Sequence, residues 1–247
     1  MKLDVSFLDY VTLDEIAEAK LMNRIDTKYI ANISCVQELL NLVNEDYKIL
    51  QINEKRILPY STRYFDTFDL EMYNEHQRGR KTRQKIRIRK YEGDKELSFV
   101  EIKKKNNKGR TKKKRVELEE GKSLIDYHEF IREISNYDVE DLIPQIENHF
   151  YRITLVRKDM SERVTIDTQL EFHNLQTGLF ASLPQIAIIE WKRKALSEYS
   201  PMHFFLKKLR IKESGFSKYC IGMAKTSPTL KQNRFKIKIR NVDKLSA

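Results

Sequence analysis

The sequence predicts an α+β fold in which an antiparallel sheet of about eight strands closes into a tunnel with a charged lumen and helices packed on the outside. Two observations predict this class. Short strand-like stretches follow one another at close spacing, with only a few helical stretches between them. Several of these stretches carry a charged residue at every second position, so each strand has one charged and one apolar face.

Charged alternation occurs in five stretches of the chain. In the clearest, Lys85, Arg87 and Arg89 alternate with isoleucine. The other stretches are residues 100–103, 163–167, 190–192 and 235–240. An ordinary half-exposed strand would explain any one of them, but several together, with carboxylates among the cations, indicate faces that converge on one polyanion. Faces that point inward require a sheet that is closed or nearly closed, with helices over its apolar exterior.

The first half of the chain is expected to hold two helices and five strands. Apolar spacing predicts helices at residues 13–22 and 34–46, and Ser34 is placed to cap the second helix with Gln37 three residues on. The predicted strands are residues 26–32, 61–66, 83–91, 96–105 and 110–119. The last two pair as a hairpin around residues 106–109, because Asn and Gly tolerate the positive φ of such a turn.

The second half is expected to add three helices and four strands. Helical spacing predicts helices at residues 124–134 and 217–224. Between them, a helix runs from Ser200 as N-cap, through Pro201 in the first turn, to Leu209. The predicted strands are residues 149–158, 163–173, 185–194 and 234–241.

Composition agrees with a polyanionic partner. The chain has 47 Lys and Arg against 36 Asp and Glu, a formal net charge of +11. This balance favours nucleic acid, an acidic membrane or phosphate chains, although a basic protein with no such partner has the same balance. The length suits one large domain or two small ones, and we expect a single domain over residues 1–247, with a core at about 20–241. Cys35 and Cys220 are isolated, and neither a signal peptide nor a spanning run is evident, so we expect a soluble, cytoplasmic protein.

Short motifs occur in an order that is similar to that of a known family. They are N-R-I-D-T-K-Y (23–29), Y-F-D-T (64–67), R-I-R (87–89), F-V-E-I-K (99–103), R-V-T-I-D (163–167), I-E-W-K (189–192) and F-S-K-Y (216–219). Each is common by itself, but from about residue 20 to 225 their order and spacing resemble the catalytic domain of the vacuolar transporter chaperone (VTC) polyphosphate polymerases. These enzymes belong to the triphosphate tunnel metalloenzymes, so the resemblance implies an antiparallel β-tunnel with a basic lumen.

The resemblance also implies roles for individual residues. It places Arg87, Arg89, Lys103, Arg163 and Lys218 at the catalytic site on the triphosphate of ATP, Lys28 and Arg157 on further phosphates, and Glu190 on a Mn²⁺ or Mg²⁺ ion. Arg152 competes with Arg157, because the aromatic pattern around both is blurred. Glu101 is the second metal candidate, since these ions prefer oxygen ligands. Strand parity adds Lys113 and Arg115 to the phosphate-binding set.

Structural roles are the alternative at these positions. Glu190 would then only pair with Lys192, and Lys218 would lie on a helix surface. The chain also departs from the family at Gly215, where members often carry a lysine just before F-S-K. One phosphate contact is therefore missing or supplied by Lys212.

The implied function is an ATP-dependent polyphosphate polymerase, a transferase that moves the γ-phosphate of ATP to a growing polyphosphate chain. A hydrolase of tripolyphosphate or nucleoside triphosphates is the alternative in the same superfamily, but such hydrolases typically begin with an alternating-glutamate motif. Asn23, Arg24, Asp26 and Lys28 stand in its place here. A third hypothesis is a non-catalytic module that binds polyphosphate or RNA. Such a module would interleave aromatic residues with its cations, whereas these strands interleave isoleucine and valine, so we expect no specific nucleic acid.

Eukaryotic members of the family add an N-terminal phosphate-sensing domain and C-terminal membrane helices. The chain shows neither, so we expect a stand-alone tunnel domain. Product export would then need a separate membrane protein, which would hold this protein at the inner face of a membrane.

Overall fold

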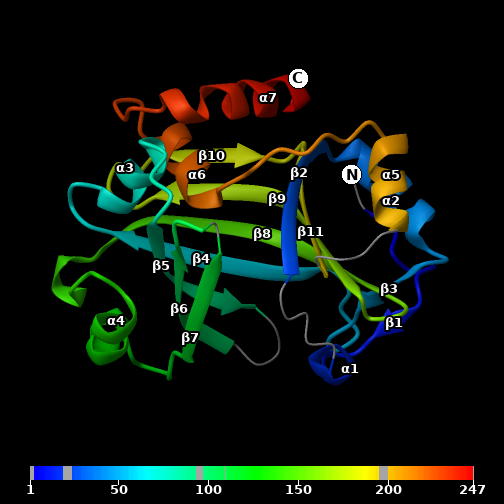
Figure 1. Ribbon diagram of the computed structural model, residues 1–247, viewed down its shortest axis with the longest axis horizontal. Coiled ribbons are helices and arrows are strands. Elements are labelled where there is room, and N and C mark those ends of the chain that lie inside the picture. Colours follow the sequence, from blue (N-terminus) through cyan, green and yellow to red (C-terminus); the bar gives the residue numbers. More distant parts are fainter. Residues whose placement is uncertain (1–2, 19–23, 93–96, 109, 195–199, 247) are drawn as a thin grey trace.

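The computed structural model of the chain describes residues 3–18, 24–92, 97–108, 110–194 and 200–246. As predicted, the fold is α+β and is built on an antiparallel sheet (Figure 1). The main strands follow one another in the order β2-β11-β9-β8-β4-β5-β6-β7. Their bounds are β2 (Arg24–Asn32), β11 (Ile186–Lys194), β9 (Glu162–Asn174), β8 (Ile143–Arg157), β4 (Leu58–Asp66), β5 (Arg83–Tyr91), β6 (Leu97–Lys105) and β7 (Thr111–Glu117). The short strands β1 (Tyr10–Val11), β3 (Tyr47–Leu50) and β10 (Phe180–Leu183) pair at its margins.

The sheet curls into a half-barrel. Figure 1 shows β5, β6 and β7 standing steeply inclined to β8 and β9. The register shifts between Tyr64 and Phe65 and between His149 and Tyr151, and such bulges bend strands. Strands β2 and β7 are the two ends of the strand order, and no pairing joins them in the described ranges. Closure of the sheet into a tunnel therefore stays a prediction.

The free edge of β2 is partly covered by the chain that leads into α6 (Lys218–Thr226). Tyr29 forms an antiparallel bridge with Glu213, and the Ser214 amide donates to the Lys28 carbonyl at 2.8 Å. Farther along, the Lys85 amine of β5 donates to Ser217 Oγ at 2.8 Å. Residues 213–217 thus connect β2 with β5, although neither strand pairs with the other.

The outer face of the sheet is apolar and covered by helices, as predicted. Helices α2 (Ser34–Val43) and α5 (Pro201–Lys208) cover one half of it. The 3₁₀ turn η1 (Leu124–Tyr127) and α4 (His128–Ile134) cover the other half. The two outer cores include Val36, Leu40, Ile153, Trp191 and Phe205 in the first, and Ile86, Val100, Ile102 and Ile131 in the second.

A buried carboxylate fixes the first of these outer layers. Glu162 Oε2 accepts hydrogen bonds from Tyr47 Oη at 2.6 Å, Trp191 Nε1 at 2.9 Å and Ser200 Oγ at 2.8 Å. Ser200 is the N-cap residue of α5, as expected, but its hydroxyl is used here and does not cap the helix. The three donors come from β3, β11 and the start of α5, so one side chain ties three elements together.

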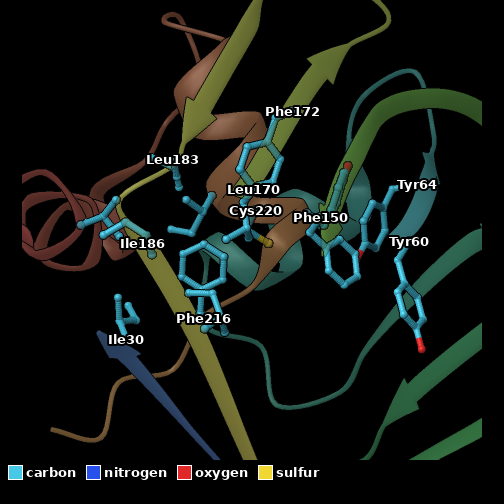
Figure 2. Close-up of a cluster of buried hydrophobic side chains, with 14 of the residues drawn as sticks. Ile30, Tyr60, Tyr64, Phe150, Leu170, Phe172, Leu183, Ile186, Phe216 and Cys220 are labelled. Atoms are coloured by element: carbon cyan, nitrogen blue, oxygen red, sulfur yellow. The ribbon is translucent and has the colours of Figure 1, made fainter. Parts of the chain in front are cut away.

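Helix α6 departs from the predicted exterior placement. Its buried residues include Tyr219, Cys220 and Met223, and they pack on the inner face of the sheet. Figure 2 shows this core, where Ile30, Leu170, Phe172 and Ile186 of the sheet meet Cys220 and Phe216. The inner face is therefore apolar at this end, and α6 covers that part because both surfaces need to be buried.

The last predicted strand is wrong. Residues 234–241 fall instead in the 3₁₀ turn η3 (Asn233–Phe235) and helix α7 (Lys236–Ser246). Phe235 and Val242 are the buried residues there, and their separation of seven is two turns of a helix. The alternation of charged residues with isoleucine is typical of a strand, but the tertiary packing of Phe235 and Val242 favours a helix here. Figure 1 shows α7 lying across the end of the molecule above α6 and β10.

Smaller differences concern helix ends. Helix α2 begins at Ser34 with Ile33 at the N-cap, and Asn32 Oδ1 accepts from the Ser34 amide, so Ser34 does not cap the helix. Helix α1 covers Leu13–Glu18, and its expected continuation to residue 22 lies outside the described residues. The remaining elements are α3 (Glu71–Gln77) and the 3₁₀ turn η2 (Val139–Asp141). No helix in the described ranges is long and apolar enough to cross a membrane.

The seat of α6 on the sheet gives a stability prediction. A Cβ on Gly222 would lie 2.5 Å from Phe172 Cδ1 and 2.7 Å from Ile146 Cδ1. We expect Gly222→Ala to destabilise the fold by about 1–3 kcal/mol, because overpacking outweighs the helix-propensity gain of ~1 kcal/mol. Denaturant unfolding followed by circular dichroism measures this change. A midpoint equal to or above that of the wild type would contradict the close contact of α6 with β8 and β9.

Candidate functional site

The register of the strands places the charged residues of the alternating stretches on one face of the sheet, opposite the outer cores. We call this set the charged face. Its members are Lys28 (β2), Glu190 and Lys192 (β11), Arg163 and Asp167 (β9), Arg152 (β8), Lys85, Arg87 and Arg89 (β5), Glu101 and Lys103 (β6), and Lys113 and Arg115 (β7), to which α6 adds Lys218. The parity argument from sequence is therefore confirmed for the strands that form the sheet.

Arg87 and Glu101 form a buried ion pair at the centre of β5 and β6. Arg87 Nε and Nη2 donate to Glu101 Oε2 at 2.8 and 2.5 Å, and Lys113 pairs with Oε1. Arg87 is 6% exposed and Glu101 is 0% exposed. Burial alone would raise the pKa of Glu101, but the neighbouring cations, Arg87 first, hold it well below its ordinary value. Glu101 is thus an ionised counter-ion that fixes the Arg87 guanidinium.

Arg152, Asp167 and Lys218 form a second group. Arg152 donates to Asp167 through Nε at 2.5 Å and Nη2 at 2.8 Å, a bidentate arrangement, and Lys218 binds Asp167 Oδ2. Lys218 Nζ also lies 4.2 Å from the centre of the Phe150 ring. Burial lowers the pKa of Lys218 to about 8, although Asp167 opposes this effect. The first residue of α6 therefore lies in the charged face rather than on a helix surface.

Glu190 lies between two lysines. Lys28 Nζ is 3.4 Å from Glu190 Oε1, and Lys192 binds Oε2. Burial would raise the pKa of Glu190, yet the charges of Lys28 and Lys192 lower it well below its ordinary value. The ion pair that the structural alternative proposed is thus present, and the carboxylate is ionised.

Lys103 shows that the two halves of the sheet face each other. The charge of Arg87 and burial lower the pKa of Lys103 well below its ordinary value, and the carboxylate of Glu190 opposes them. Four strands lie between β6 and β11 in the strand order, so a flat sheet would put these residues about 24 Å apart. Charges at that distance are screened by salt. The influence of Glu190 on Lys103 therefore reflects the curl of the sheet.

Arg89 is buried without a carboxylate partner of its own. It is 8% exposed, its Nε donates to Thr62 Oγ1 at 3.4 Å, and it forms no ion pair within the described part of the chain. Burial and the charges of Arg87 and Arg152 lower its pKa. Neither Arg87 nor Arg89 is therefore a solvent-facing strand residue.

Arg157 lies away from the charged face, and Arg163 contacts α1. Arg157 is on the outer face, where its guanidinium meets Glu162 at 3.3 Å and Asp159 at 3.4 Å. Strand parity explains the correction, because Arg152 and Arg157 are five positions apart and point to opposite faces. Arg163 shares the charged face but sits toward α1, and its Nη2 donates to the Ile16 carbonyl at 3.4 Å.

The carboxylates differ in how well they fit a divalent metal. Both oxygens of Glu101 are paired with Arg87 and Lys113 and its side chain is 0% exposed, so Glu101 is closed to a metal ion and does not fit. Glu190 is ionised and 19% exposed in its side chain, and Thr165, directly across the strand pair, has a buried hydroxyl with no hydrogen bond in the described region. These are oxygen ligands of the kind that Mg²⁺ and Mn²⁺ prefer. No cluster of three or more His, Cys, Asp or Glu occurs among the described residues, so the substrate would have to complete the ligand set.

Several solved structures are similar to this chain, and the first of those that follow supports the fold. The chain is similar to a candidate adenylyl cyclase from Hippeastrum, reported with a dominant triphosphatase activity, with a TM-score of 0.50 and 16% identity over 83% of this chain and 97% of that chain. A protein described as a candidate adenylate cyclase from Bacillus halodurans has a TM-score of 0.49 and 14% identity over 79% of this chain and 96% of that chain. A protein from Pyrococcus horikoshii has a TM-score of 0.47 and 14% identity over 82% and 99% of the two chains.

Comparison with protein families gives the relationship of most of the chain. No curated protein sequence matches it. The model of the VTC domain matches residues 23–227, which include every member of the charged face. The chain therefore belongs to the VTC domain family.

Proposed function

We propose that this protein is a polyphosphate polymerase, which transfers the γ-phosphate of ATP to a growing polyphosphate chain on the charged face. The observation that carries the proposal is the surplus of cations over carboxylates there, with Arg87 and Arg89 buried. Arg89 and Lys103 lie among other cations, and their lowered pKa values express the repulsion and the burial that they experience. A bound phosphate chain would neutralise them, and membership in the VTC family supports a phosphate substrate.

The arginines on this face suit a triphosphate. A guanidinium binds two phosphate oxygens at once, and its contribution is larger when the group is already held in place. Glu101 holds Arg87 and Asp167 holds Arg152, so neither side chain needs to be ordered when the substrate binds. Lys103 and Lys218 add point charges for further oxygens.

The proposed reaction needs no protein nucleophile. An oxygen of the terminal phosphate of the growing chain attacks the γ-phosphorus of ATP, the bond from that phosphorus to the bridging oxygen breaks, and ADP leaves. The cations stabilise charge on the transferred group and hold the two reactants in line. A curled sheet whose cations face each other would enclose both reactants, and we propose that they occupy a tunnel along this face.

Glu190 is the residue that we propose for the divalent metal, with phosphate oxygens of the substrate as further ligands. When bound, the ion would neutralise phosphate charge and polarise the P–O bonds. Lys28 and Lys192 keep the Glu190 carboxylate ionised, which metal binding requires. We also propose that the protein acts in the cytoplasm and that a separate membrane protein receives the product.

One assay tests the reaction. Purified protein is incubated with γ-labelled ATP and Mn²⁺ or Mg²⁺, and the products are separated by gel electrophoresis and thin-layer chromatography. We expect long labelled polymers that an exopolyphosphatase degrades. Labelled orthophosphate alone would instead identify a hydrolase, and no turnover together with polyphosphate binding would identify a binding module.

Lys103→Gln tests the charged face without breaking an ion pair. The Lys103 side chain makes no hydrogen bond in the described part of the chain and is repelled by the charge of Arg87, so its loss relieves repulsion. We expect turnover to fall by about 10²-fold or more, with a free energy of unfolding equal to or above that of the wild type. Arg63→Gln is the matched control, because Arg63 lies on the other face of β4, paired with Glu147. Equal turnover losses in both variants would contradict the assignment.

Glu190→Gln separates a metal ligand from a simple counter-ion. We expect metal-dependent turnover to fall by more than about 10²-fold, because the neutral amide is a poor ligand for a hard cation. Polyphosphate binding in EDTA should be equal or tighter, since Lys28 and Lys192 are then released for phosphate. Calorimetric titration measures that binding. Turnover at the wild-type level with unchanged metal dependence would remove Glu190 from the metal site.

A further inference from the structure

Residues 228–246 lie outside the matched VTC range but are packed firmly against it. Phe235 is 2% exposed, and its ring lies 5.7 Å from that of Tyr73 and 5.4 Å from that of His76, between centroids. Farther on, Asn32 Nδ2 of β2 donates to the Leu245 carbonyl of α7 at 2.6 Å. The C-terminal segment is thus anchored to both α3 and the sheet.

This segment is strongly basic. Residues 228–247 contain six Lys and Arg and one Asp. Two of these cations reach glycines in the domain: a Cβ on Gly215 would lie 3.2 Å from Lys238 Nζ, and one on Gly79 would lie 2.4 Å from Arg234 Nη1. Both cations occupy space that a side chain at those positions would fill. Family members often carry a lysine at the position of Gly215. The amine that lies beside Gly215 in this structure is that of Lys238, not that of Lys212.

Lys238 and Arg234 join two cations of β5. Burial lowers the pKa of Lys238, and Arg234 and Arg83 lower it further, so these charges act on one another. We call Arg83, Lys85, Arg234 and Lys238 the basic rim. Within the described ranges, no carboxylate forms an ion pair with any of the four.

The basic rim continues the charged face. Lys85 belongs to both sets, since it lies opposite Lys103 in the sheet and donates to Ser217 Oγ beside α6. Lys28 Nζ is 3.4 Å from the Phe216 carbonyl in the same segment. The residues that cover the edge of β2 therefore stand between the charged face and Lys238, with cations on both sides.

We infer that the basic rim is a second phosphate subsite, which binds the part of an inorganic polyphosphate chain that extends beyond the charged face. This inference rests on the proposed function and adds to it a preference for long chains. Four neighbouring cations that form no ion pair within the described ranges attract anions from outside the protein. Inorganic polyphosphate fits better than RNA, because the Tyr73 and Phe235 rings at this site are buried and offer no face on which a base could stack.

Binding measured without metal or turnover tests the inference. The full chain carrying Arg234→Gln and Lys238→Gln is titrated with tripolyphosphate and with long-chain polyphosphate. We expect tripolyphosphate affinity to stay within about twofold of the wild type and long-chain affinity to fall roughly 5- to 30-fold. The slope of log affinity against log salt should also fall by about one per cation for the long chain only. Lys236→Gln is the matched control, because a residue two positions from Lys238 faces another side of α7.

The possible outcomes separate the two proposals. If the double variant and Lys236→Gln lose affinity for the long chain equally, the basic rim is not a phosphate subsite. The same holds if the double variant loses affinity for tripolyphosphate and for the long chain to the same extent. An RNA oligonucleotide of similar phosphate number that competes as well as polyphosphate would overturn the assigned ligand. Lys103→Gln should lower the affinity for both tripolyphosphate and long-chain polyphosphate. If Lys103→Gln binds both ligands as the wild type does while the double variant loses affinity for the long chain, the role of the charged face is contradicted and that of the basic rim is supported. Thermal unfolding of each variant checks that α7 stays in place.

Discussion

Crowding of many cations on one side of a sheet, with Arg87 and Arg89 buried among them, is the constraint to which the rest of the structure responds. Each carboxylate on the charged face serves two cations, Glu101 between Arg87 and Lys113 and Glu190 between Lys28 and Lys192. An ionised group inside a protein is tolerated only when it is paired or solvated. The carboxylates stay ionised because the cations around them lower their pKa values. The cations that remain unpaired repel one another, and that repulsion is what a phosphate chain would remove.

A face with this charge cannot supply a hydrophobic core, so the core lies elsewhere. The outer cores under α2, α5 and α4 are apolar, and the one buried carboxylate in the first, Glu162, is satisfied by three neutral donors and Arg157. The inner face is divided, with α6 covering its apolar end. Because α6 begins at Lys218, the helix that fills this end also contributes a cation to the charged part. Packing and charge placement therefore depend on the same short helix.

Local sequence patterns predicted the charged face well, because strand parity is a property of neighbouring residues. Arg87, Glu101 and Lys103 could be assigned to one side without knowledge of their partners. The errors arose where distant packing decides. Residues 236–240 alternate as a strand would, yet Phe235 and Val242 bury as helix residues against parts of the chain far away in sequence. The inner placement of α6 depends on apolar residues from β2, β9 and β11 meeting in space, which no single stretch displays.

The choice between Arg152 and Arg157 illustrates the same limit within the site. Motif resemblance placed one arginine on β8 but could not fix its register, whereas pairing does so directly: Arg152 stands opposite Asp167, and Arg157 stands opposite Tyr47 on the outer side. A shift of one residue in a strand moves every side chain to the other face. The position of Lys238 also depends on tertiary packing: its amine lies beside Gly215 because Phe235 anchors η3 on α3. A cation that lies outside the matched family residues can thus complete a face built within them, and only the folded chain reveals that it does.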